Sequence, residues 1–142
     1  MCQGLADGTI DAIATDHAPH HYDEKQVEFD RAPFGITGLE TAVSLCFDRL
    51  VHAAVVSLPR MIELLAVNPA RILGLPGGSL SAGAPADLTL LAPDLSVEVS
   101  AARMRSKSKN TPFDGWRLRG GVAATIVGGR TVYVNDAVRL PL

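Results

Sequence analysis

The chain has 142 residues, of which 47% are hydrophobic and 20% are charged, and its formal net charge is −2. This balance is typical of a globular domain with a buried core, and a charge so near zero argues against a nucleic-acid or anionic-membrane partner. No apolar stretch reaches the roughly 18–20 residues that a membrane-spanning helix requires.

The chain begins with a predicted strand and a long loop. The largely apolar run 9–15 predicts a strand that is buried on both faces. Residues 16–36 follow, with three of the four histidines, two prolines and a cluster of charges. Long loops inside compact domains often carry function, so this segment is the first candidate for a site.

Three helices are expected next. Thr37 and Glu40 match a capping box, and the apolar residues after Thr37 recur at helical spacing at Leu39, Ala42, Val43, Cys46, Phe47 and Leu50. A second helix is expected to begin after Ser57. A third is expected to begin at Asn68, with proline in its first turn, and to end near Gly74.

The second half of the chain predicts β-structure. Residues 76–85 are dominated by Gly, Ser, Ala and Pro and predict a turn-rich connection. Four short strands are expected after it, at 87–91, 96–100, 123–127 and 130–134. Two glycines, at 128 and 129, separate the last two strands and predict a two-residue hairpin turn.

These elements predict an α/β fold that is incomplete. A strand that is apolar on both faces needs neighbouring strands and helices, and four short strands need a second layer. We interpret residues 1–75 as the last strand and helices of an incomplete (β/α)8 TIM-type barrel. Residues 76–142 are then the C-terminal strands of a small β-sandwich domain. A free-standing α+β domain is the alternative.

The segment 15–21, Thr-Asp-His-Ala-Pro-His-His, carries the candidate chemistry. Asp16 follows the predicted strand, and barrel enzymes place catalytic groups at the C-terminal ends of their strands. Pro19 keeps the following backbone out of a helix, so the imidazoles are expected in a shaped loop. The histidine spacing fits no standard zinc cage. Composition alone therefore leaves open both a metal or catalytic role and an ordinary polar loop.

Residues 13–21, Ile-Ala-Thr-Asp-His-Ala-Pro-His-His, resemble the final barrel-strand motif of the dihydroorotases, a family in the amidohydrolase superfamily. The resemblance is to the C-terminal portion of these enzymes, and it continues in order through 24–25, 32–42, 68–75, 83–88, 106–113 and 128–133. Asn-Pro-Ala-Arg and Gly-Ala-x-Ala-Asp-Leu are widespread in the superfamily. Asp-His-Ala-Pro-His together with Ser-Lys-Asn-Thr-Pro-Phe is more specific.

The resemblance implies a zinc-dependent dihydroorotase, which reversibly hydrolyses (S)-dihydroorotate to N-carbamoyl-L-aspartate in de novo pyrimidine biosynthesis. It implies that Asp16 is both a metal contact and the catalytic residue. Metal-bound hydroxide would attack the ring amide, and Asp16 would pass the proton to the departing nitrogen. His20 would help to bind the substrate carboxylate, and the backbone of Phe34 and Gly35 would contact the substrate ring.

The family's other site residues match nothing in this chain. Missing are the paired histidines of the first barrel strand, the substrate-binding arginine near them, the bridging carboxylated lysine or aspartate, and the two histidines of the middle strands. The one or two zinc ions would therefore take most of their ligands from outside this chain, since a catalytic zinc normally has three protein ligands. The chain alone is expected to be inactive and to fold poorly.

Two other functions are open, together with the partners they imply. One is a non-catalytic dihydroorotase-like subunit that scaffolds aspartate transcarbamoylase, and the other is a different cyclic amidohydrolase, such as a hydantoinase or an allantoinase. A homodimer or a complex with aspartate transcarbamoylase is the expected assembly. Cys2 and Cys46 suggest no disulfide framework, and the first residues do not resemble a signal peptide, so the cytoplasm is the expected compartment.

Overall fold

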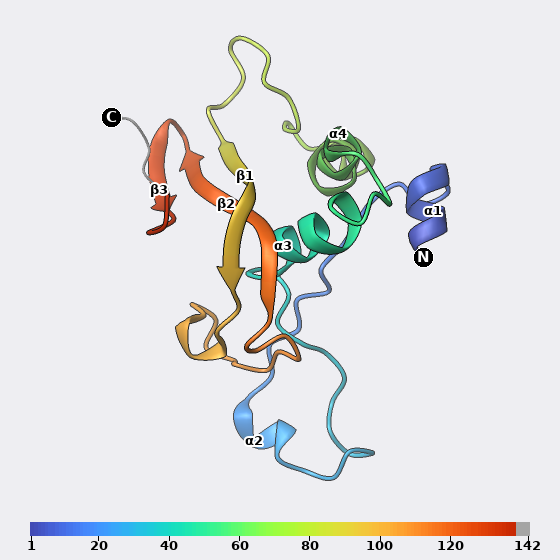
Figure 1. The fold of residues 1–142 in the computed structure, drawn as a ribbon, viewed down its shortest axis with the longest axis vertical. Helices are drawn as coiled ribbons and strands as arrows, with labels where there is room; N and C mark the ends of the chain where they lie inside the picture. Colours follow the sequence, from blue (N-terminus) through green and yellow to red (C-terminus); the bar gives the residue numbers. More distant parts are fainter. Residues whose placement is uncertain (139–142) are drawn as a thin grey trace.

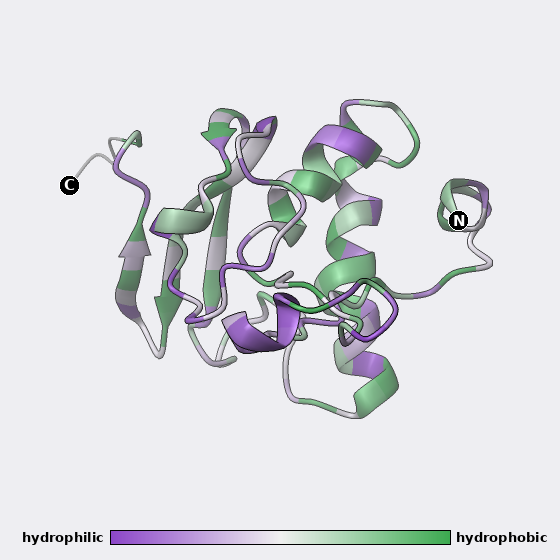
Figure 2. Cartoon of the chain, turned by 90° about the horizontal axis from the view of Figure 1, so that it is seen from below, coloured by the Kyte–Doolittle hydropathy of each residue, from purple (hydrophilic) through white to green (hydrophobic). Residues whose placement is uncertain are grey.

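A layer of helices packs against a three-stranded antiparallel sheet in the computed structural model, which describes residues 1–138 (Figure 1). The strand order is β1-β2-β3, and Figure 2 shows the sheet on one side and the helices on the other. The elements are α1 (Cys2–Asp7), α2 (Tyr22–Lys25), α3 (Ala42–Cys46), the π-helical η1 (Phe47–Val51), α4 (Leu58–Ile62), the π-helical η2 (Glu63–Val67), α5 (Asn68–Leu73), β1 (Leu88–Glu98), the 3-10 helix η3 (Ala101–Arg103), β2 (Arg117–Val127) and β3 (Arg130–Val134).

Residues 9–15 form no strand, so this prediction is wrong. They lie along the helices instead: the N–H of Ile13 donates to the carbonyl of Leu64 at 2.9 Å, and the side-chain amide of Asn68 donates to the carbonyl of Asp11 at 2.8 Å. A strand needs hydrogen bonds to a neighbouring strand, and none of the strands within residues 1–138 lies beside this segment.

The first predicted helix forms, but it begins later than expected. Thr41 precedes it in place of Thr37, and α3 continues into η1. Thr37 and Glu40 form no capping box; both bond to the segment 104–110, as described below. The side chains of Thr37 and Glu40 cannot cap the helix because they are engaged in these tertiary hydrogen bonds.

The second and third predicted helices are one continuous helix made of α4, η2 and α5. Ser57 caps its start, as predicted, and accepts a hydrogen bond from the N–H of Arg60 at 3.3 Å. Asn68 is not an N-cap, because its φ of −66° and ψ of −45° are helical. The preceding π-helical turn bonds the N–H of Asn68 to Glu63, and Pro69, which has no N–H, follows this wider turn. The helix ends at Gly74, as predicted.

The sheet has three strands where four were predicted. The expected strands 87–91 and 96–100 are both parts of β1, whose register shifts between Ala92 and Ser96. Pro93 lies in this irregular stretch, on an edge strand that tolerates the loss of an N–H donor. β2 begins at Arg117, earlier than predicted, and β3 and the Gly-Gly hairpin turn match the prediction.

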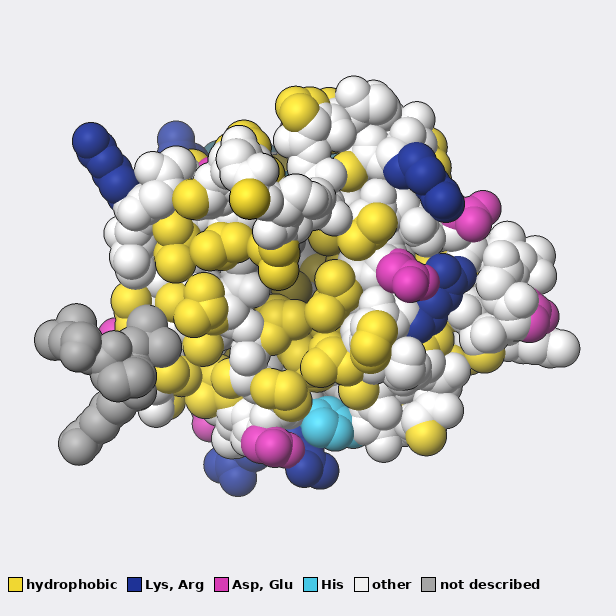
Figure 3. Space-filling view, turned by 90° about the horizontal axis from the view of Figure 1, so that it is seen from above, with side chains coloured by type: hydrophobic (Ala, Val, Ile, Leu, Met, Phe, Trp, Pro, Cys, Tyr) yellow, Lys and Arg dark blue, Asp and Glu magenta, His cyan; other side chains and the backbone are white. Residues whose placement is uncertain are grey.

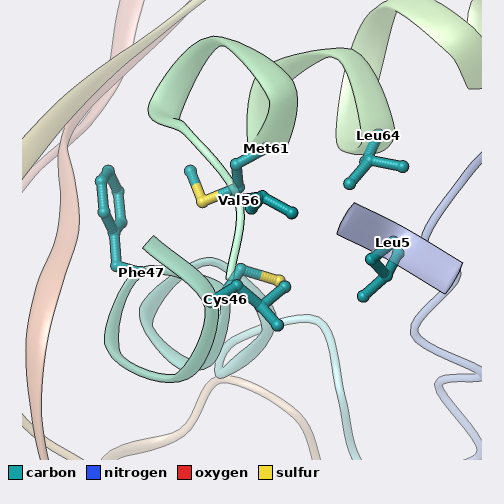
Figure 4. Close-up of a cluster of buried hydrophobic side chains, with 7 residues drawn as sticks. Leu5, Cys46, Phe47, Val56, Met61 and Leu64 are labelled. Atoms are coloured by element: carbon teal, nitrogen blue, oxygen red, sulfur yellow. The ribbon is translucent and has the colours of Figure 1, made fainter. Parts of the chain in front are cut away.

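The main core lies among the helices (Figure 4) and consists of Leu5, Cys46, Phe47, Leu50, Val56, Met61 and Leu64. Phe47, which is fully buried, also reaches the sheet at Gly120. A Cβ atom on Gly120 would overlap the Phe47 side chain, and Gly120 has a φ of 99°, so both the close approach and the backbone require glycine. This contact joins the helical layer to β2.

A second cluster of Val99, Met104 and Leu118 lies at the other end of the sheet, with Phe113 packed against it. It supports the segment that follows η3. No helix in the described part of the chain is long and apolar enough to cross a bilayer.

Candidate functional site

Asp16 lies at the end of the extended segment that the sequence predicted as a strand. Its φ is 45°, in the left-handed region that residues other than glycine adopt at a cost of about 1–2 kcal/mol. The next residue, His17, is fixed by the turn beyond the loop, since its Nδ1 accepts hydrogen bonds from the N–H groups of Gly38 at 3.0 Å and Leu39 at 3.3 Å. His17, to which the sequence assigned no role, therefore holds the backbone beside Asp16.

The loop between residues 17 and 36 is closed at its base. His17 and Ile36 form a parallel β-bridge, and the N–H of Ala18 donates to the carbonyl of Ile36 at 2.9 Å. The short helix α2 lies within the loop. His21 caps it, accepting at Nδ1 from the N–H of Asp23, while the Glu24 carboxylate accepts from the N–H of His21. His21 thus has a structural role.

His20 connects the two sides of the loop. Its Nε2 lies 2.8 Å from the carbonyl oxygen of Phe34, and its Nδ1 lies 3.3 Å from the Glu24 carboxylate. Because a carbonyl oxygen only accepts, Nε2 must carry the proton in this bond. The structure therefore brings together two of the three predicted substrate-binding residues, His20 and Phe34, through the Phe34 backbone.

Lys25 and Asn110 hold the carbonyl groups on either side of Phe34. The Lys25 ammonium donates to the carbonyl oxygens of Pro33 and Gly35, the latter at 2.9 Å. The Asn110 side-chain amide also donates to the Gly35 carbonyl, at 2.8 Å. Together with the His20 bond, three successive carbonyl groups each accept a side-chain hydrogen bond.

The backbone at position 35 requires glycine. Gly35 has a φ of 115°, and a Cβ atom there would lie 2.5 Å from the Ala18 Cβ and 3.3 Å from the His20 Nε2. The side chain of Phe34, by contrast, is 95% exposed. The groups of this segment that other residues hold in place are therefore backbone groups, and the predicted backbone contacts to a substrate stay a prediction.

The segment 104–110 forms one wall of the loop, a role that the sequence did not reveal. The N–H and hydroxyl of Thr37 donate to the Asn110 carbonyl at 2.9 and 3.1 Å. The Glu40 carboxylate accepts from the N–H groups of Arg105 and Ser106 at 2.9 and 3.0 Å. The only signal for this contact was the resemblance around residues 106–113, which named no role.

A pocket of about 670 Å³ lies between α2 and this wall. Its lining includes the side chains of His20, His21, Lys25, Lys107, Lys109 and Asn110. The lining is mixed, because Pro19 and Tyr22 also contribute to it and the ammonium groups of Lys25 and Lys109 already donate to backbone carbonyls. Asp16 is not part of the lining.

The residues present do not make a metal cage. Within residues 1–138, no three His, Cys, Asp or Glu side chains lie close enough together to hold a metal ion. The loop histidines are directed to backbone groups and to Glu24, and Asp16 can offer at most one carboxylate ligand. A catalytic zinc normally requires three protein ligands.

Comparisons with known proteins match nearly the whole chain. The Amidohydrolase family model covers residues 2–132. A dihydroorotase from Pelotomaculum thermopropionicum is 55% identical over 137 residues, which are 96% of this chain and 32% of that protein. A dihydroorotase from Geobacter metallireducens is 53% identical over 131 residues, or 92% of this chain and 31% of that protein. The chain therefore spans about a third of the length of the curated relatives it matches.

Solved structures match the fold of nearly the whole chain, at lower sequence identity. An L-hydantoinase (dihydropyrimidinase) from Arthrobacter aurescens superposes with a TM-score of 0.89 at 31% identity, covering 98% of this chain and 32% of that one. A dihydropyrimidinase from Brevibacillus agri gives a TM-score of 0.87 at 22% identity, covering 95% and 31%, and shows likeness of fold alone. These matches confirm the predicted fold class. The division into domains at residues 75 and 76 stays a prediction, and residues 139–142 of the second domain lie outside the described residues.

Proposed function

The chain belongs to the amidohydrolase family, and we propose that it forms part of a dihydroorotase, which reversibly hydrolyses (S)-dihydroorotate to N-carbamoyl-L-aspartate. The observation that carries this proposal is the identity to curated dihydroorotases, 53–55% over 92–96% of the chain. The L-hydantoinase is only 31% identical over the same region. Sequence identity over this chain therefore supports the first activity better than the second.

Asp16 is proposed as the catalytic residue of this enzyme. Its side chain is exposed, and within residues 1–138 its carboxylate forms no hydrogen bond and no ion pair. A carboxylate free of partners can take the proton of the attacking water and deliver it to the departing ring nitrogen. The strained backbone at Asp16 supports the proposal, because such strain is often found at functional sites.

His20, Phe34 and Gly35 are proposed to bind the substrate. Support for His20 comes from the pocket that it lines, and support for Phe34 and Gly35, which lie outside that lining, comes from the fixed backbone of residues 33–35. Within residues 1–138, the N–H groups of Phe34 and Gly35 donate to no acceptor. They are therefore available to the polar edge of a dihydropyrimidine ring.

Membership in this family generally implies a metal cofactor, and we propose zinc. The described residues do not fit a zinc site on their own, so most of the ligands would be supplied by residues outside this chain. We therefore expect purified residues 1–142 to retain no zinc after dialysis, as measured by metal analysis. Stoichiometric zinc in that sample would contradict the assignment.

The product of the native gene that contains these residues is called the full-length protein below. An activity assay on the full-length protein and on residues 1–142 alone tests the function. We expect the full-length protein to turn over dihydroorotate, with hydantoin and allantoin at least about a hundredfold poorer in kcat/KM. Asp16→Asn should lower kcat by about a hundredfold or more, because general acid–base catalysis contributes that much. A full-length protein with no turnover of dihydroorotate, or with faster turnover of hydantoin, would overturn the proposal.

A further inference from the structure

The peptide groups from Pro33 to Ile36 are held by side chains that come from two separate parts of the chain, the loop itself and the segment 104–110. Lys25 in α2 bonds the carbonyls of Pro33 and Gly35, and His20 bonds the carbonyl of Phe34 that lies between them. Asn110, from the segment beside the sheet, bonds the Gly35 carbonyl a second time.

Fixing these oxygens also fixes the direction of the N–H groups. A trans peptide is planar, with its C=O and N–H pointing to opposite sides. When Lys25 holds the Pro33 oxygen, the N–H of Phe34 must point away from the ammonium group. When His20 holds the Phe34 oxygen, the N–H of Gly35 must point away from the imidazole.

Neither of these two N–H groups donates to an acceptor among residues 1–138. Gly35 lacks the side chain that would screen its N–H from a ligand, and its φ of 115° is maintained by the bonds on its carbonyl. Two adjacent, fixed and unsatisfied donors make a binding site for a carbonyl or carboxylate oxygen.

We propose that Lys25 and Asn110 are positioning residues for the N–H groups of Phe34 and Gly35. Lys25 orients the Phe34 N–H through the Pro33 carbonyl, and Asn110 together with Lys25 holds the Gly35 carbonyl, which keeps Gly35 in place while His20 orients its N–H toward the substrate. This inference rests on the proposed function. Neither residue needs to touch the substrate for this role. Asn110 also joins the segment beside the sheet to the loop, so the two parts of the chain would shape one substrate site.

The test uses the full-length protein with dihydroorotate as the substrate. Lys25→Met keeps the length of the side chain but removes its donors, Lys25→Arg keeps donors, and Asn110→Asp keeps the shape but removes the amide donor. Arg31→Met and Asn135→Asp are matched controls, because each makes a comparable change at a side chain that does not bond residues 33–35. A melting curve accompanies each variant.

We expect Lys25→Met and Asn110→Asp to raise KM about tenfold with kcat changed less than about threefold, because the lost contacts bind ground state and transition state alike. Lys25→Arg should recover most of the KM, and both controls should match the wild type. A purely structural clamp would instead lower the melting temperature and the active fraction, so that apparent kcat falls while KM stays unchanged. That pattern would overturn the inference.

Hydrogen exchange of the wild type provides an independent measurement if a variant fails to fold. Adding N-carbamoyl-aspartate or dihydroorotate should protect the amides of Phe34 and Gly35. Unchanged exchange at both amides in an active enzyme would overturn the inference and leave the proposed function standing. Absence of dihydroorotase activity in the wild type would instead overturn the proposed function.

Discussion

The three histidines of residues 17–21 each hold a different backbone group. His17 accepts from the turn at residues 38 and 39, His20 donates to Phe34, and His21 caps α2. All three bonds fix the loop around Asp16 rather than forming a metal cage. These three histidines therefore shape a loop of about twenty residues whose only helix among the described residues is the one-turn α2.

Gly35→Ala tests the fit of this loop. In the full-length protein we expect it to lower the free energy of unfolding by roughly 2–4 kcal/mol, because it combines an unfavourable φ with overlap at Ala18. Gly83→Ala is the matched control: Gly83 has a φ of 87° with nothing within 4 Å of its would-be Cβ, so only the backbone cost of about 1–2 kcal/mol is expected. Denaturant unfolding measures both. Equal losses in the two variants would contradict the tight contact at Gly35.

The two cysteines should differ in reactivity. Burial raises the pKa of the Cys46 thiol, whereas Cys2 is exposed. Alkylation of the full-length protein near pH 8 should therefore modify Cys2 first, and denaturant should remove the difference. The raised pKa of Cys46 also makes the free energy of unfolding depend on pH. Its contribution to stability is present at neutral pH and is lost as pH rises through the folded-state pKa of Cys46. Equal alkylation rates in the native protein would show that Cys46 is accessible.

At the scale of the elements, the residues at which the helices begin depend on tertiary contacts as much as on local capping motifs in the sequence. Ser57 caps its helix as its sequence indicates, yet Thr37 and Glu40, which match a capping box equally well, bond to Asn110 and to residues 105–106. A local motif predicts a cap only where no competing partner lies nearby. Here the wall beside the loop is that partner, and the helix begins at Ala42 instead.

Phe47 is the side chain that couples the helical layer to the sheet. Phe47→Ala should destabilise the full-length protein by about 3–5 kcal/mol, since it leaves a cavity facing Gly120 and the main core. Phe34→Ala provides the comparison, because that side chain is 95% exposed, and its stability should change by less than about 0.5 kcal/mol. Thermal or chemical unfolding measures the difference. A small loss for Phe47→Ala would mean that the layers are held together elsewhere.

At the scale of the whole molecule, much apolar surface is uncovered. Figure 3 shows hydrophobic side chains gathered over one end of the molecule. All five residues of β3 are exposed, including Val132 at 55% and Val134 at 42%. A sheet of three strands usually buries both an apolar face and its edges against further structure. This surface agrees with a chain that spans about a third of its relatives.

We therefore expect residues 1–142 alone to unfold over a broad temperature range and to bind a hydrophobic dye before they unfold, because the exposed apolar surface has no partner. The full-length protein should unfold sharply and bind little dye. Calorimetry and dye fluorescence measure the two properties. A sharp, cooperative transition of the isolated chain would show that the helical layer and sheet are sufficient for a stable fold.

The sequence by itself determined the family resemblance, the helix that starts after Ser57, the hairpin at residues 128–129 and the candidate residues Asp16, His20, Phe34 and Gly35. These follow from local signals, since caps, turns and contiguous motifs need only a few neighbouring residues. Only the tertiary structure decided that residues 9–15 are not a strand and that Lys25 and Asn110 hold the carbonyls of residues 33–35. A strand requires a neighbour, and a hydrogen bond between positions 75 residues apart leaves no pattern in a single sequence.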